Sequence, residues 1–110
     1  MSRRIRNISS TPVSVSGQDP LGDEALAVST TAVGFASVPA GATRAFVTVT
    51  TAAGEYLRFR VAGTAATATV GHMVTNEDVF ALDTPAQLAE FSIIRDTAAV
   101  EDGAVFVTYF

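Results

Sequence analysis

Residues Arg44 to His72 read RAFVTVTTAAGEYLRFRVAGTAATATVGH and contain two runs in which side chains alternate between two faces. One face of the first run holds Ala45, Val47 and Val49, and one face of the second holds Leu57, Phe59 and Val61. Alternation with a period of two over five or six residues is typical of a half-buried strand. The residues between the runs, 51–55, include a glycine and suit a hairpin loop. This stretch therefore predicts a hairpin at the centre of a sheet, with Phe59 in the core.

Further short strand candidates lie on both sides of this stretch. They are residues 26–28, 33–35, 70–74, 79–82, 91–95 and 104–110, and Val13 and Val15 also alternate with serines. Thr84 can cap a single helical turn, with Pro85 at its first position and Gln87 completing a capping box. About seven or eight short strands without a long helix predict an all-β fold, an antiparallel two-sheet β-sandwich or jelly roll. A small closed barrel is the alternative.

The chain has 110 residues, which fits a single domain. Residues 1–24 predict an extended N-terminal arm, because large apolar side chains are few there and polar residues, glycine and proline surround them. Residues 25–110 predict the β-sandwich domain. Its last strand, 104–110, carries apolar residues on both faces, and we expect this strand to be covered on both sides.

The composition narrows the classes of function. The chain has no cysteine, which leaves no disulfide and no thiolate-ligated metal site. Only 16% of the residues are charged, below the usual quarter, which suggests that a partner covers part of the surface. A compositional bias towards alanine and threonine is the other explanation for the low fraction of charged residues.

The net charge of the chain is −4, and an acidic body argues against nucleic-acid binding. No apolar run approaches the roughly 20 residues that span a bilayer, and the arginine-rich start lacks the apolar core of a secretory signal.

The sequence contains no catalytic motif, phosphate loop or zinc spacing, and we expect no enzyme, cofactor or metal. The single histidine, His72, is more typical of a structural or exposed position than of a base or ligand. Three pairs of neighbouring acids lie in predicted loops, at residues 23–24, 77–78 and 101–102. None of them has the alternating spacing of a calcium loop, so solvated loop charge is the favoured interpretation.

Two groups of residues are candidates for partner binding. Tyr56, Arg58 and Arg60 share one face of a predicted strand, and tyrosine and arginine are enriched where interfaces concentrate their energy. The alternative is a solvated sheet face in which arginine stems cover apolar surface. Arg3, Arg4 and Arg6 form a second group, which either pairs with acids of a partner or is a solvated tail.

Several segments together resemble small virion proteins of tailed bacteriophages. These segments are Val38–Thr43 (VPAGAT), Tyr56–His72 (YLRFRVAGTAATATVGH), Phe91–Arg95 (FSIIR) and Val105–Phe110 (VFVTYF). The resemblance covers about residues 25–110 and includes no catalytic residue. Ala66 departs from the pattern, because a proline is common at that position. The resemblance implies a β-sandwich structural protein of the head or tail.

This resemblance favours a capsid decoration or cement protein that binds the major capsid protein lattice as a homotrimer. Such a protein is made in the host cytoplasm and resides in the virion, with no nucleic-acid or membrane partner. The alternative is a tail or fibre module that binds a host-surface glycan or receptor, for which Tyr56 is the candidate aromatic platform. We expect the arginines of the N-terminal arm to dock on an adjacent subunit, because guanidinium groups pair with carboxylates through two parallel hydrogen bonds.

Overall fold

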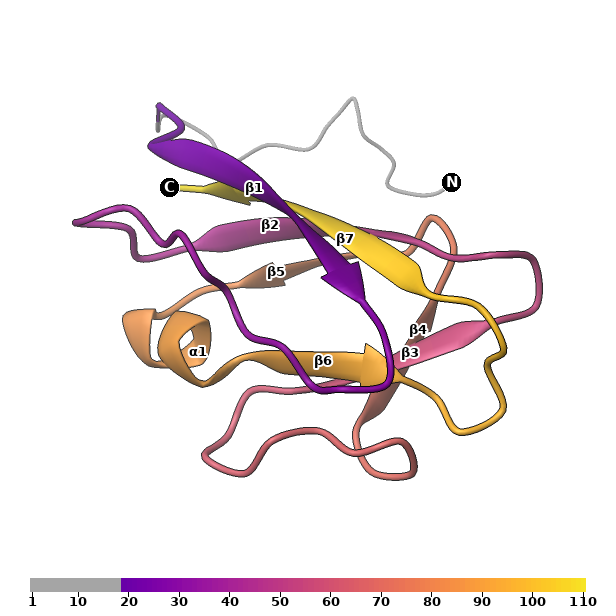
Figure 1. Cartoon of the computed structure of the whole chain (residues 1–110). Helices are drawn as coiled ribbons and strands as arrows, with labels where there is room; N and C mark the ends of the chain where they lie inside the picture. The colour runs from indigo at the N-terminus through magenta and orange to yellow at the C-terminus, as the bar shows by residue number, and fades with distance from the viewer. Residues whose placement is uncertain (1–18) are drawn as a thin grey trace.

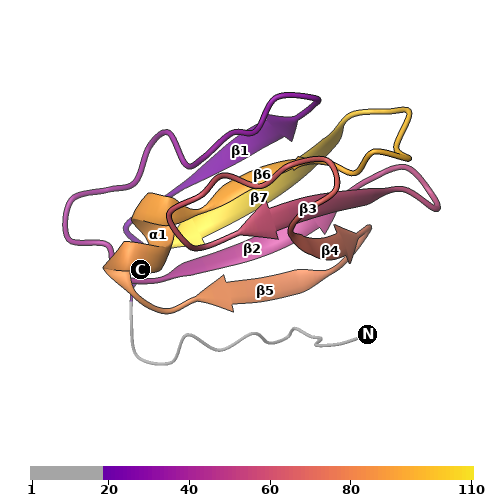
Figure 2. The ribbon, with the colours of Figure 1, turned by 90° about the horizontal axis from the view of Figure 1, so that it is seen from below.

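The computed structural model describes residues 19–110, so Arg3, Arg4, Arg6 and the rest of the arm up to residue 18 lie outside the described residues. The elements are β1 (Gly22–Val28), β2 (Ala45–Thr50), β3 (Tyr56–Arg60), β4 (His72–Thr75), β5 (Val79–Leu82), α1 (Pro85–Glu90), β6 (Ser92–Arg95) and β7 (Gly103–Tyr109). Sheet A has the strand order β1-β7-β2-β5 and sheet B the order β4-β3-β6. The two antiparallel sheets face each other as in a sandwich (Figures 1 and 2). The predicted all-β, two-sheet fold is confirmed, whereas a jelly roll is not.

The predicted hairpin between the two alternating runs is wrong. β2 pairs with β5 and β7 in sheet A, and β3 pairs with β4 and β6 in sheet B. The loop 51–55 passes from one sheet to the other, with Gly54 at a φ of 77° and the amide of Glu55 donating to the carbonyl of Ala52. Alternation reports only that each run is half-buried, and it is the same for strands that pair and for strands in facing sheets. Each run is nevertheless an interior strand of its own sheet.

The core lies between the sheets and is formed by the inward-facing residues of both. Its most enclosed members are Val28, Leu57, Val47, Val49, Ile93, Val105, Val107 and Tyr109, each less than 2% exposed. Phe59 is less buried than predicted. It packs against the edge of this core, where its ring stacks on Phe80 with centroids 4.4 Å apart. Leu57, two residues earlier on the same strand, occupies the fully buried position.

β1 begins at Gly22, three residues before the expected start of the sandwich domain. Glu24 lies on its inward side, where the carboxylate accepts hydrogen bonds from the amides of Ala36 and Ser37 and from the hydroxyl of Tyr109. These bonds tie the segment that follows β1 to the end of β7. Burial and the neighbouring carboxylate raise the pKa of Tyr109 well above its ordinary value, so its hydroxyl stays a donor.

The predicted helical turn is present as α1. Thr84 is the N-cap and accepts a hydrogen bond from the amide of Gln87, with Pro85 in the first turn. The Gln87 side chain bonds back to the amide of Asp83, one residue before the cap. This arrangement closes the helix start in the manner of a capping box. Leu88 is its buried residue, so α1 closes the core where the chain passes from β5 to β6 (Figure 1).

Candidate interaction surfaces

The outward side of sheet B is covered in part by the chain's own loop, residues 61–71, whereas Tyr56 and Met73 on the same side stay 40% and 48% exposed. Ser92, Ile94 and Asp96 lie on or just beyond β6 on this side, and each is less than 9% exposed. The amide of Ala66 in the loop donates to the Ser92 hydroxyl at 2.7 Å. The amide of Thr97 donates to a loop carbonyl in the same region. The loop is therefore joined to the sheet by hydrogen bonds to buried polar groups, and such bonds are expensive to leave unmade.

Arg58 is part of this covering structure. Its Nε donates to Oδ1 of Asp96, and its Nη1 donates to the carbonyl of Gly71 at 3.2 Å. The amide of Ala98 is the largest cause that holds the pKa of Asp96 below its ordinary value, and the Arg58 side chain is the next. The guanidinium thus joins sheet B, the covering loop and the turn after β6. Its charge is already matched within the chain.

The other predicted interface residues of β3 lie differently. Tyr56 is 40% exposed at the start of the strand, and Arg60 is half-buried at its end. The fold therefore keeps the three side chains on one side of β3 but places Arg58 under its own loop. A partner role for Tyr56 and Arg60 stays a prediction.

The outward side of sheet A, here called the outer face, has a different character. The strand register places its side chains in three rows: Ala27, Ala104 and Thr50; Ala25, Phe106, Thr48 and Val79; Asp23, Thr108, Phe46 and Ala81. Asp23, at one corner, is the single charged member of these rows. Phe106 is 50% exposed and Val79 42% exposed. The expectation that the last strand is covered on both sides is not met by residues 19–110, since none of them covers Phe106.

The outer face is large enough to matter for binding. Its width is three strand spacings, and its length is about six residues of strand, roughly 14 by 20 Å in all. The largest apolar patch of a typical monomer is about 300–600 Å² and is often functional. The outer face falls near the lower end of that range, and its near-complete lack of charge matches the core of an interface.

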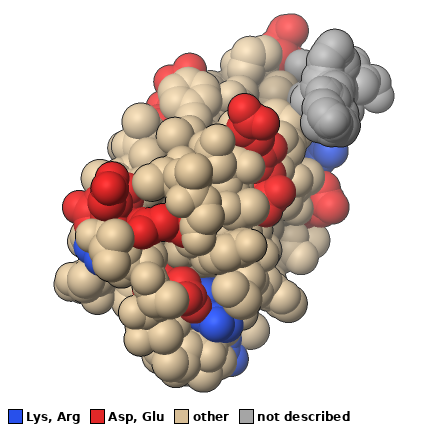
Figure 3. Space-filling model, turned by 90° about the vertical axis from the view of Figure 1, so that its right-hand side faces the viewer, with Lys and Arg blue, Asp and Glu red and all other residues tan. Residues whose placement is uncertain are grey.

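The rest of the described surface is acidic. All eleven acidic residues of the chain lie in residues 19–110, together with only four of the seven arginines, which gives this part a formal net charge of −7. Six of these acids lie at one end of the sandwich, here called the loop end: Glu55, Glu77, Asp78, Asp96, Glu101 and Asp102. Figure 3 looks onto this end and shows several separate red patches and fewer blue ones among uncharged residues. Arg58 and Arg95 pair with Asp96 and Asp102 there, which leaves an excess of negative charge.

The loop end is organised by its own hydrogen bonds. Glu55 accepts from the amides of Val100 and Glu101, and these bonds lower the pKa of its carboxyl. Within residues 19–110 no group of three or more potential metal ligands converges. The acids that were predicted as solvated loop charge lie in or beside loops, apart from Asp23 and Glu24, which lie on β1.

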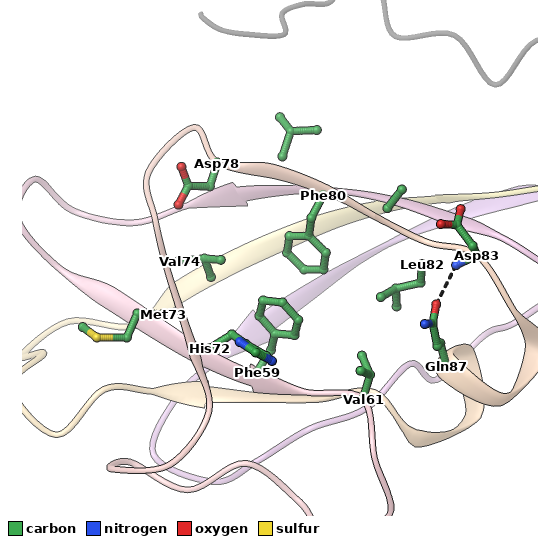
Figure 4. A pocket seen from close by; sticks show the side chains of 12 residues that line it. Phe59, Val61, His72, Met73, Val74, Asp78, Phe80, Leu82, Asp83 and Gln87 are labelled. Atoms are coloured by element: carbon green, nitrogen blue, oxygen red, sulfur yellow. Dashed lines mark hydrogen bonds between the residues drawn. The ribbon is translucent and has the colours of Figure 1, made fainter.

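A cleft of about 490 Å³ opens between the edge strands β4 and β5, where the two sheets part (Figure 4). The parallel rings of Phe59 and Phe80 lie in it, and the imidazole of His72 packs against Phe59 with centroids 5.2 Å apart. Asp78 lies towards one end, and Asp83 with Gln87 towards the other. The two rings face each other, so one face of each ring is not available for a sugar to stack on. His72 packs on a ring, in keeping with a structural role.

The outer face was not singled out from the sequence, although its signal was present. Phe46, Thr48 and Thr50 alternate with buried residues, and so do Phe106 and Thr108, and none of them is charged. Strand register was needed to show that these side chains adjoin. Asp96 as the partner of Arg58 had no sequence signal, because the two residues are far apart in the chain.

Comparisons with known proteins identify no relative. No protein-family model, no curated protein and no solved structure matches the chain. No helix within the described residues is long and apolar enough to cross a membrane. The family resemblance of the sequence therefore stays a prediction.

Proposed function

We propose that the protein is a non-enzymatic structural protein of a bacteriophage particle, a capsid decoration or cement protein that binds the major capsid protein lattice. The observation that supports this proposal is the uncharged outer face on an otherwise acidic domain. Charged residues are depleted at the centre of protein interfaces, and apolar and aromatic residues are enriched there. A flat sheet face of this size suits one part of a contact with another protein surface.

The bacteriophage assignment derives from the sequence resemblance, and the structure adds the surface that would make the contact. On the particle, we propose that copies gather as homotrimers and that the outer face lies against the lattice or a neighbouring copy. Phe106 is the centre of this contact, because it is the largest exposed side chain of the face and has Ala25 and Thr48 on either side.

The first test counts copies of the chain in purified particles by quantitative mass spectrometry. A decoration protein is present in hundreds of copies, in proportion to the major capsid protein. A count of a few copies would contradict decoration and favour the tail or fibre alternative. Absence from the particle would contradict a virion role altogether.

The second test compares two variants of the full chain that place an aspartate on the surface. Phe106→Asp puts a charge in the middle of the outer face, and we expect it to abolish incorporation into particles. Val100→Asp is the matched control, because Val100 is 76% exposed at the loop end, away from the outer face. Equal incorporation of both variants, each with an unchanged thermal midpoint, would contradict the outer face as the contact.

The glycan-binding alternative has less support. Tyr56 is exposed, as an aromatic platform must be, but the other two residues on its side of β3 are arginines, so it is the single aromatic side chain there. The aromatic rings of the cleft stack on one another. We therefore give the tail or fibre role only as the outcome that a low copy number would indicate.

A further inference from the structure

We propose that, in the free protein, residues 1–18 of the same chain lie across the outer face and carry their arginines to the loop end. The N-terminal arm would then be an intramolecular cover for the surface that a partner later occupies. The proposal concerns the free chain, and it holds whether or not the partner is a capsid protein.

The first argument is the difference between the two sheets. Residues 61–71 cover the outward side of β6 and of Arg58 in sheet B, whereas no residue from 19 to 110 covers Phe106 and Val79 on the outer face in this way. The outer face is roughly 300 Å² in plan, which is well under the 800 Å² or so that each partner contributes to a stable dimer. A second copy seated on this face alone would bind weakly, whereas a tethered segment needs no such area because it is always nearby.

The second argument is where the described chain begins. The amide of Leu21 donates to the carbonyl of Tyr109, so the chain enters β1 at the edge of the outer face opposite the loop end. Pro20 and Gly22 stand at this point, in a stretch whose composition favours a turn. A reversal there would send the preceding residues back over sheet A, towards the loop end.

The third argument is length. An extended chain advances about 3.3 Å per residue, so the residues between the arginines and Gln18 reach about 40 Å. The outer face is only about 20 Å long. The arm can cross the face diagonally with several residues to spare, and Val13 and Val15, about 10–17 Å from Gln18 in an extended chain, would fall over its middle.

The fourth argument is charge. Residues 1–18 contain Arg3, Arg4 and Arg6 and no acid, and residues 19–110 carry a net charge of −7. The loop end has six acids and two arginines, so three more guanidinium groups would reduce its excess negative charge. In the proposed orientation, the apolar residues of the arm lie over the uncharged outer face and its arginines lie over the acidic loop end. Each part of the arm then contacts a surface of suitable character.

Disulfide trapping can test directly whether the arm lies on the outer face, because the chain has no cysteine of its own. The double variant Ser14→Cys with Thr48→Cys places one thiol in the part of the arm that would lie about 13 Å from Gln18 and one at the centre of the outer face. The matched control, Ser14→Cys with Thr64→Cys, places the second thiol at an exposed position of the loop that covers part of sheet B. In dilute full-length protein, we expect the first pair to form an intramolecular disulfide about tenfold faster than the control.

Two outcomes of this experiment would overturn the proposal. Equal rates for the two pairs would mean that the arm has no preference for the outer face. Disulfide-linked dimers as the main product of the first pair would mean that the arm of a second copy is the occupant. Neither outcome depends on particle incorporation, so failure here is distinguishable from failure of the proposed function.

The contact between the arginines and the loop end can be tested separately, by the rate of disulfide formation in the same double-cysteine variant. Reversal of the three arginines, with Arg3→Glu, Arg4→Glu and Arg6→Glu, should lower the trapping rate of the first pair to that of the control. High salt should lower it part of the way, because exposed pairs are screened. An unchanged rate in the reversed variant would contradict the contact with the loop end.

Discussion

The outward sides of the two sheets differ in what covers them and in how polar they are. Sheet B is covered by a loop that buries Ser92, Asp96 and part of Arg58, and each of these polar groups has a hydrogen-bond partner. The outer face of sheet A has almost no charge and no polar anchor of this kind. A cover held by buried polar groups is specific and costly to remove, whereas an apolar, uncharged face can exchange one cover for another. The first arrangement stabilises the fold, and the second is suited to assembly.

The largest effect should come from removing the anchor of the covered side. Arg58→Ala leaves the carboxylate of Asp96 buried without its cation, and loss of one partner of a buried pair costs about 3 kcal/mol. Urea denaturation should show this as a lower midpoint with an unchanged slope. Arg60→Ala, two residues along the same strand, is the matched control and should cost less than about 1 kcal/mol. Equal costs would mean that the Arg58–Asp96 pair contributes little to the fold.

The loop that covers sheet B should also be sensitive at Gly71. This residue has a φ of 146°, and a Cβ there would lie 3.0 Å from the carbonyl oxygen of Phe59. Gly71→Ala should cost about 2–3 kcal/mol, since strain and close approach add. Gly41 also has a positive φ, of 84°, but no atom within 4 Å of the added carbon, so Gly41→Ala should cost about 1 kcal/mol. Thermal unfolding of the two variants measures this order. A smaller cost for Gly71→Ala than for Gly41→Ala would mean that the loop adjusts freely to the added carbon.

Acid should loosen the covered side through Asp96. Its pKa is lower in the folded protein than its ordinary 3.8, so at pH values between the two the unfolded chain binds more protons. The stabilisation is complete above about pH 4 and is lost as the pH falls through the lower, folded-state value. Asp96→Asn should therefore give a flatter fall of unfolding free energy below pH 4 than wild type. Asp23→Asn, exposed on the outer face, is the comparison. A wild-type slope in Asp96→Asn would contradict this assignment.

The sequence predicted the elements of this fold better than their pairing. Alternation placed Val47 and Leu57 correctly in the core, and the pattern at Thr84, Pro85 and Gln87 predicted the helix start. These are local features, and local spacing determines them. The pairing of β2 with β7 and of β3 with β6 joins residues that are far apart in the chain, and no local pattern encodes it.

The candidate surfaces show the same division. Arg58 was noticed because of its residue type, but its role depends on Asp96, a residue 38 positions away. The outer face is composed of ordinary strand residues, and only the register of four strands brings Phe106 beside Thr48 and Ala25. Its near absence of charge could be read along each strand, but its continuity could not.

The smallest effect on stability should come from the outer face itself. Phe106→Thr removes an aromatic ring that is 50% exposed and has no described residue over it, so the unfolding free energy should change by less than about 1 kcal/mol. Val107→Thr, the next residue of β7, points into the core at 0% exposure and introduces a hydroxyl without a partner. We expect that variant to cost about 1–3 kcal/mol. Urea denaturation of the two variants sharpens the comparison of an exchangeable face with a fixed core. A cost for Phe106→Thr equal to that of Val107→Thr would mean that the outer face is firmly packed in the free protein, and that no partner could take it without unfolding part of the chain.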